Sequence, residues 1–173
     1  YFILGGVGIG LALFGTMLVY LAAQPALGPG LRAMSFAALA GQAAHMDGAL
    51  LTLAFLFILF GYGTKAALVP LHGWLPDAYA EGPAPLTTAL SGLLINVALL
   101  AILRFRHLMQ ANAAAGGSAM HPGPFLLTLG VASLFLAAFS FSRRRDARRF
   151  FGFSSIEQSG LVAFAFGIGG PVA

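Results

Sequence analysis

The chain has 173 residues, of which 59% are hydrophobic and only 8% are charged, and its formal net charge is +4. A soluble domain carries about 25% charged residues, so a fold of this composition cannot cover its surface in water and most of that surface must face lipid. The chain has no cysteine, which excludes disulfides, thiolate metal sites and cysteine-held iron–sulfur clusters within it.

Apolar stretches long enough to cross a bilayer, which takes about 20 residues, recur along the chain. The predicted spans are residues 1–22, 48–70, 86–103, 123–142 and 150–170. The sequence therefore predicts an all-α fold, a polytopic transmembrane bundle of about five spans. Since Tyr1 already lies within an apolar run, we expect the bundle to be a fragment of a larger subunit.

The segments between the spans differ in character. Residues 31–45 are short and amphipathic, which favours a helix lying on the membrane surface. Asp47 is placed to cap the second span. Residues 71–85 contain three prolines and two acidic residues, which predicts a polar, proline-broken connection. Residues 107–121 are rich in alanine, glycine and asparagine and are predicted to form a loop.

The orientation in the membrane follows from the basic residues. Five arginines lie within Arg143–Arg149, and short loops rich in lysine and arginine stay in the cytoplasm. Five spans place this loop on the same side as residues 71–85, and Arg32, Arg104 and Arg106 on the opposite side. We therefore expect a multi-pass protein of the plasma membrane with the Arg143–Arg149 loop in the cytoplasm.

Three polar side chains lie inside predicted spans, and counting from the cytoplasmic face places them in one layer. Lys65, the only lysine of the chain, precedes Pro70 by five residues. Asn96 and Glu157 lie about ten residues into their spans, or roughly 15 Å at the rise of a helix. A charge at mid-membrane costs about 3 kcal/mol, so such a residue faces water or a partner. Lys65 and Asn96, on consecutive spans, are predicted partners in a proton relay.

The interpretation of Lys65 has an alternative. A lysine near the end of a span can extend its ammonium group to the membrane surface. Gly61, Gly63 and Pro70 surround it, and this combination favours either an ordinary kink or a broken helix of the kind that lines ion paths. A continuation of the helix past Pro70 towards Trp74 would make Lys65 more central.

Other polar residues also carry two readings. Glu157 lies in the small and polar stretch 154–160, which is typical of a wet stripe or of adhesion between helices. Asn96 cannot titrate and suits an interhelical hydrogen bond. His72 has the titration range of a proton carrier, but a histidine at an interface is more often a hydrogen bonder.

The remaining polar and glycine-rich features are the two acidic residues of the connection, the other histidines and one glycine-rich stretch. We expect Asp77 to cap a helix and Glu81 to lie at the membrane surface, and either could gate proton entry. The other histidines lack metal-ligand spacing, so no metal site is predicted. The stretch GGVGIG, residues 5–10, lies inside a span, where its glycines, including the Gly6/Gly10 pair, predict close helix packing.

The stretches GYGTKAALVPLHGWLPDAY, residues 61–79, and EGPAPLTTALSGLLINVALLAILRF, residues 81–105, resemble the antiporter-like membrane subunit family. That family includes proton-pumping subunits of respiratory complex I, Mrp-type sodium/proton antiporters and hydrogenase-4-type complexes. Full members of the family have about fourteen membrane spans. The resemblance implies that this fragment corresponds to the sixth to tenth of those spans.

The resemblance implies roles for particular residues. The lysine that matches Lys65 lies at a break in the seventh span and carries protons. Asn96 stands where complex I relatives have a titratable residue, which is similar to hydrogenase-4 component F-like subunits, and the Glu157 motif resembles that branch too, with Gln158 in place of a frequent histidine. Pro70 and Trp74 belong to the same specific series, which runs from Lys65 to Asp77, and are expected to shape the break.

The expected function is therefore proton translocation by a membrane subunit of a redox-driven complex, of the hydrogenase-4 or NADH:quinone oxidoreductase type. Lys65 is the predicted carrier, Glu157 and His72 are relays, and Asn96 is a polar link. We expect no cofactor and no redox chemistry on this chain, with other membrane subunits and peripheral redox subunits as partners and no nucleic acid. The alternatives are an Mrp-type sodium/proton antiporter subunit and a non-transporting membrane scaffold.

Overall fold

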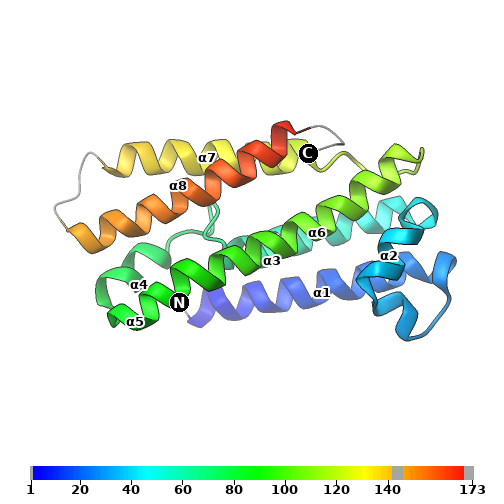
Figure 1. Cartoon of the computed structure of the whole chain (residues 1–173), viewed down its shortest axis with the longest axis horizontal. Coiled ribbons are helices and arrows are strands. Elements are labelled where there is room, and N and C mark those ends of the chain that lie inside the picture. The colour runs from blue at the N-terminus through cyan, green and yellow to red at the C-terminus, as the bar shows by residue number, and fades with distance from the viewer. Residues whose placement is uncertain (1, 142–145, 170–173) are drawn as a thin grey trace.

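The computed structural model describes residues 2–141 and 146–169, and the described part of the chain is built from helices. Figure 1 shows the long helices running alongside one another. In chain order the elements are α1 Phe2–Leu27, η1 Leu31–Met34, α2 Phe36–Gln42, η2 Ala43–His45, α3 Gly48–Lys65, α4 Leu75–Glu81, α5 Ala84–Ala89, η3 Leu90–Leu94, α6 Ile95–Ala114, α7 Gly123–Phe141 and α8 Ala147–Ile168.

Two groups of helices make up the bundle. α1 packs along α3, and α3 packs along α6, while α7 and α8 form a second antiparallel pair (Figure 1). The backbone contacts of the second pair with the first group are made mainly between α8 and α4. The short helices gather at the two ends of the bundle, with α2 at one end and α4 and α5 at the other.

Four of the described helical segments are long and apolar enough to cross a membrane: Ile3–Leu27, Gly48–Lys65, Ala84–Ala114 and Gly123–Phe141. The protein is therefore a multi-pass membrane protein, as the sequence predicts. α8 has 22 residues, enough to cross, but Arg148, Arg149 and Glu157 make it more polar than the others. The predicted fifth crossing at 150–170 stays a prediction.

Glycines set the close approach of α1 to α3, and one of them, Gly8, belongs to the predicted stretch 5–10. A Cβ atom on Gly15 would lie 2.6 Å from Cγ1 of Ile58 and 2.9 Å from the carbonyl oxygen of Ala54. Gly6 and Gly10 face open space within the described structure. The packing predicted for the glycines of this stretch is therefore made by Gly8, which meets Gly61 and Thr64 of α3, and not by the Gly6/Gly10 pair within the described structure.

The end of the bundle that carries α2 is held by two polar side chains. Asp47 caps α3 as predicted, because its Oδ1 accepts hydrogen bonds from the amides of Ala49 and Leu50 at 2.9 and 3.1 Å. Asn112 is completely buried, and its Nδ2 donates to the carbonyl oxygens of Ala43 and Met46 at 2.8 and 3.0 Å. These bonds fix the short segment before α3 against α6.

Two connections differ from the sequence prediction. Residues 71–85, predicted to be a polar, proline-broken connection, contain the helix α4, whose Leu75, Pro76 and Tyr79 are buried. The predicted loop at 107–121 begins only after Ala114, since α6 continues to that residue. In both places tertiary packing provides buried partners for residues that look like loop by composition.

The α1–α3 contact gives a test with a matched control. Gly15→Ala places a methyl group against the backbone of α3, and overpacking of this kind costs about 1–3 kcal/mol. Gly10→Ala, on an open face of the same helix, should change stability by less than about 0.5 kcal/mol. Thermal unfolding of the complete protein in detergent should therefore show a lower midpoint for Gly15→Ala only, and equal midpoints would contradict the packing described.

Candidate functional site

The helix α3 ends at Lys65, and regular helix resumes only at Leu75. The amide of Leu68 donates to the carbonyl oxygen of Gly63 at 3.0 Å, the bond that closes a Schellman C-cap. Ala67 occupies the left-handed position of this cap, with φ of 54°, where glycine is usual and alanine costs about 1–2 kcal/mol. A strained and buried cap of this kind marks a candidate functional site.

The break lies near the middle of the bundle in height. The amide of Val69 donates to Oγ of Ser133 at 3.0 Å, and Ser133 lies close to the centre of α7. Thr64, next to Lys65, lies against Gly8 of α1, and α1 continues beyond that point. Lys65 is half-buried and thus ends a helix inside the bundle instead of at its surface.

The freed backbone groups at the break find partners. Nε1 of Trp74 donates to the carbonyl oxygen of Thr64 at 2.6 Å, which ties the start of α4 to the last turn of α3. Trp74 is buried, with 6% of its surface exposed. Nδ1 of His72 is buried and makes no hydrogen bond within the described residues.

Asn96 lies at about the same height as Lys65. Gly48 approaches the side chain of Asn112, and the path from Gly48 to Lys65 is almost as long in residues as the path from Asn112 back to Asn96. The predicted layer is therefore consistent with the packing of α3 on α6. Nδ2 of Asn96 donates to the carbonyl oxygen of Gly92 at 2.8 Å, and the pairing of Lys65 with Asn96 stays a prediction.

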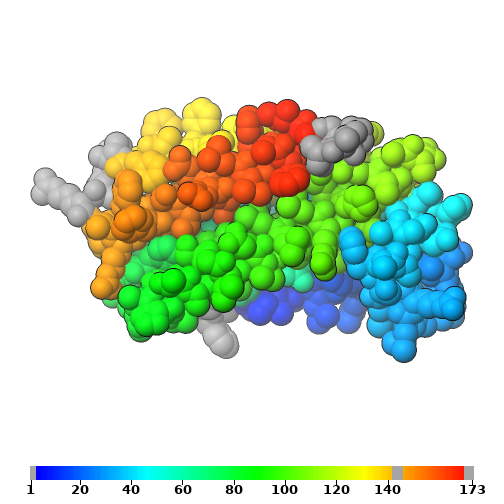
Figure 2. All heavy atoms as spheres, viewed as in Figure 1, coloured from blue at the N-terminus to red at the C-terminus, as the bar shows by residue number. Residues whose placement is uncertain are grey.

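The turn of helix before Asn96, η3, is a π-helix, a wide turn often found at functional sites. Two cavities adjoin it along the seam between α8 and the α5–α6 segment, and these elements lie on the face shown in Figure 2. The larger, of about 530 Å³, is lined by Tyr79, Gly82, Ala84, Thr87, Thr88, Ser91, Gly92, Arg148, Phe151, Ser154, Ser155 and Gln158. The smaller, of about 130 Å³, is lined by Ser91, Ile95, Asn96, Leu99, Ser155, Gln158, Ser159 and Val162.

The cavities share Ser91, Ser155 and Gln158. Together they form a polar groove, which we name by these three residues, leading from the α4–α5 end to the height of Asn96. Hydroxyl and amide groups both donate and accept hydrogen bonds, and a polar cavity of this size can hold several water molecules. Serines and a glutamine of the stretch 154–160 thus line the groove on the face of α8 that points towards α5 and η3, whereas Gly160 of the same stretch packs on α7. Whether the stretch is wet stays a prediction.

Glu157 is not part of this groove. It is half-buried and lies about 160° around α8 from Ser155, two residues away at 100° per residue. The face that carries Gly160, which packs on Ser133 and Gly130, is nearer to it. The structure therefore places Glu157 beside α7, at a height close to the break, and its role as a relay stays a prediction.

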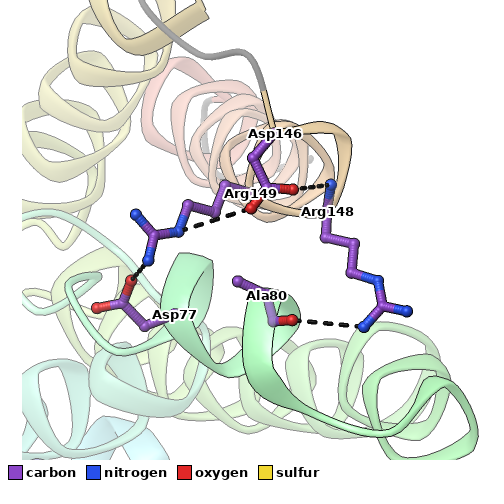
Figure 3. Close-up of polar contacts among 5 residues, drawn as sticks. All are labelled: Asp77, Ala80, Asp146, Arg148 and Arg149. Atoms are coloured by element: carbon purple, nitrogen blue, oxygen red, sulfur yellow. Dashed lines mark hydrogen bonds and ion pairs between the residues drawn. The ribbon is translucent and has the colours of Figure 1, made fainter.

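The expected cap function of Asp77 is wrong. α4 begins after Trp74 without a side-chain cap; the amide of Leu75 donates to the carbonyl oxygen of His72 at 3.0 Å, and Pro76 has no amide proton. Oδ1 of Asp77 instead pairs with Nη2 of Arg149 at 3.3 Å, as Figure 3 shows. Glu81 is exposed at the end of α4. Arg143, Arg144 and Arg145 lie outside the described residues.

The two ends of the bundle agree with the predicted grouping of the basic residues. Arg148 and Arg149 lie at the α4–α5 end (Figure 3), whereas the guanidinium of Arg104 stacks over Phe36 at the α2 end. Arg106, predicted as a residue closing a span, is 3% exposed and donates from Nη2 to the carbonyl oxygen of Gly169 at 2.9 Å. It therefore anchors the last turn of α8.

Ser133, which holds the break, and Asn112, which holds the α2 end of the bundle, are not identified from the sequence. One of two serines in an apolar helix and an asparagine near a helix end are weak signals, because most such residues only bond to their own helix. Within the described ranges no group of three or more His, Cys, Asp and Glu side chains comes together. The expectation that the chain binds no cofactor stays a prediction.

A polytopic bundle with a spanning helix that breaks beside a half-buried lysine has the discontinuous-helix form known from membrane transport proteins. The chain belongs to the NADH:quinone oxidoreductase/Mrp antiporter transmembrane family, whose profile matches residues 1–173. The predicted family is thereby confirmed.

Two relatives show which members of the family this chain resembles. The chain is 57% identical over 173 residues to a hydrogenase-4 component F homolog of Methylacidiphilum infernorum, which covers all of this chain and 36% of the relative. It is 33% identical over 131 residues to NAD(P)H-quinone oxidoreductase chain 4 of a Synechococcus strain, which covers 76% of this chain and 23% of the relative. The predicted likeness to component F is confirmed.

A solved structure has the same fold. A chain of the membrane-bound sulfane sulfur reductase, an archaeal respiratory membrane complex, superposes with a TM-score of 0.81 at 28% identity. The match covers 98% of this chain and 32% of that one. The present chain thus spans about a third of the length of the proteins it matches over its full length.

The hydrogen bond between Val69 and Ser133 gives a local test. Ser133→Ala leaves the Val69 amide unpaired inside the bundle, which costs about 1–3 kcal/mol. Hydrogen exchange of the peptide 66–74 in the complete protein should then accelerate by about tenfold or more, since 1.4 kcal/mol is a factor of ten. Ser140→Ala on the same helix is the control and should leave this exchange unchanged. Equal exchange in both variants would show that Ser133 does not hold the break.

Proposed function

We propose that this chain is the central part of a proton-translocating membrane subunit of a redox-driven complex, of the hydrogenase-4 or NADH:quinone oxidoreductase type. The observation that carries the proposal is the break in α3 beside Lys65, at the mid-height of α7. Family membership and the likeness to a hydrogenase-4 component F homolog support the same conclusion.

The chemistry begins with the position of Lys65. Desolvation disfavours the charged form of an amine, and a nearby carboxylate favours it. An amine inside a bundle therefore changes its proton occupancy when a charge near it appears or moves. A lysine at the membrane surface would exchange its proton with bulk water regardless of such changes, so the mid-height position is what makes Lys65 a useful carrier.

Water at the break would connect the amine to its surroundings. The unpartnered Nδ1 of His72 provides one site for such water, and the polar groove provides others along α8. Asn96, which lines the smaller cavity, would orient water without titrating. Pro70 and Trp74 shape the break, and Glu157, beside α7, would bias the charge state of the layer from the opposite face of α8.

The energy for transport would come from other subunits. The family name combines quinone oxidoreductases with antiporters, and this chain has no motif for a redox cofactor. We propose partners among the membrane subunits and the peripheral redox subunits of the complete assembly. The Arg143–Arg149 loop is proposed to face the cytoplasm of a plasma membrane, on the grounds of its charge.

Replacement of the lysine tests the proposal. Lys65→Met in the complete complex keeps roughly the length of the side chain but removes its proton site, so no proton can be carried at this position. Redox-driven proton uptake into inverted vesicles should therefore fall close to background, while the amount of assembled complex stays as in the wild type.

The control is Arg32→Met, which removes an exposed cation at the opposite end of the bundle and should leave proton uptake unchanged. Proton uptake at the wild-type rate in Lys65→Met would refute the role of Lys65. Sodium-dependent proton exchange in vesicles that lack a redox substrate would instead assign the subunit to the antiporters.

A further inference from the structure

α4 is too short to hold its own position. It has seven residues, and isolated helices of that length are not stable because nucleation is unfavourable. Its place in the bundle therefore depends on what it contacts. Since α4 follows the break directly, its position also sets the geometry of the segment 66–74.

The contacts of α4 come mainly from the first half of α8. A Cβ atom on Gly152 would lie 2.8 Å from Cα of Pro76, so the two backbones meet directly. Further along, the hydroxyl groups of Tyr79 and Ser155 lie 3.3 Å apart. These contacts place α4 on one face of α8. The rotation and height of α4 are set by the polar contacts at the two ends of α4.

Two arginines of the first turn of α8 hold those ends (Figure 3). Arg149 pairs with Asp77 in the first turn of α4 at 3.3 Å, and Nη1 of Arg148 donates to the carbonyl oxygen of Ala80 at 3.4 Å. A carboxylate near the start of a helix and a cation near its end are both favoured by the helix dipole. Asp146, which caps α8, lies 3.9 Å from Nε of Arg149.

A chain of contacts joins this pair to the lysine. Asp77 belongs to the same short helix that begins after Trp74, and Trp74 donates to the carbonyl oxygen of Thr64, the residue before Lys65. A displacement of α4 would therefore pull on the last turn of α3. Energetic coupling between sites is carried through contiguous contacts of this kind.

We infer that Arg149 and Asp77 are a positioning pair that sets the geometry of the break and, through Trp74, the place of Lys65. The inference rests on the proposed function for its effect on transport. The pair is partly exposed, with 35% of the Arg149 side chain and 69% of the Asp77 side chain accessible, and exposed pairs contribute little to stability. The pair acts by positioning α4, so its loss should lower proton transport without unfolding the subunit.

The first test is proton uptake by the complete complex. Arg149→Gln and Asp77→Asn should each lower redox-driven uptake severalfold, the double variant should be no worse than either single variant, and Arg149→Lys should restore most of the rate. Non-additivity is the signature of two residues that act as a unit. Wild-type rates in both single variants, or losses that multiply in the double variant, would overturn the pair.

The second test reads the break directly and does not depend on Lys65. The chain has no cysteine, so Val69→Cys in a complete subunit freed of other cysteines reports the accessibility of the break by its rate of alkylation. Arg149→Gln should raise that rate severalfold, and Arg149→Lys should not. Arg32→Gln, at the other end, is the control. An unchanged rate in Arg149→Gln would overturn the inference.

The two tests separate the proposals. Normal transport in Lys65→Met together with a faster alkylation in Arg149→Gln would refute the proposed function and keep the positioning of the break. Lost transport in Lys65→Met with no effect of Arg149→Gln in either test would keep the function and refute the positioning pair.

Discussion

The structure depends on one constraint: a helix that ends inside a membrane protein must satisfy its free backbone groups without lipid or bulk water. Unpaired peptide groups cost several kcal/mol in hydrocarbon, so the end of α3 is enclosed by protein. The cap at Ala67 pairs Leu68 with Gly63, Ser133 accepts the amide of Val69, and Trp74 takes the carbonyl oxygen of Thr64. Each partner comes from a different part of the chain, and the break can exist only because all of them are assembled around it.

That requirement explains how the two groups of helices are joined. α7 supplies Ser133, which accepts a hydrogen bond from the amide of Val69 in the break. α8 supplies the face on which α4 lies. Arginine anchors α8 at both ends, since Arg149 and Arg148 contact α4 at one end and Arg106 bonds to Gly169 at the other. Between these anchors the side chains of serines and a glutamine of α8 line the polar groove. The arrangement keeps the helix fixed while leaving space for water beside it.

Features that depend on local interactions were predictable from the sequence, whereas features that depend on contacts between distant residues were not. The cap at Asp47 was predictable because an N-cap is local, and the spans were predictable because crossing a bilayer needs a long apolar stretch. Which glycines pack was not fully predictable, because Gly8, Gly10 and Gly15 are equivalent in composition and only the rotation of α1 against α3 distinguishes them. Asp77 likewise reads as a cap until Arg149 is brought to it from a distant part of the chain.

By itself, then, the sequence determined that the protein is helical, lies in a membrane, and carries a single lysine among glycines and a proline, because composition and local backbone preferences are sufficient for each of these. Only the tertiary structure decided that the lysine ends a helix at mid-height, which face of α8 is polar, and which of the serines holds the break. Those features depend on contacts between residues far apart in the chain, where small differences in rotation and height decide which side chains meet.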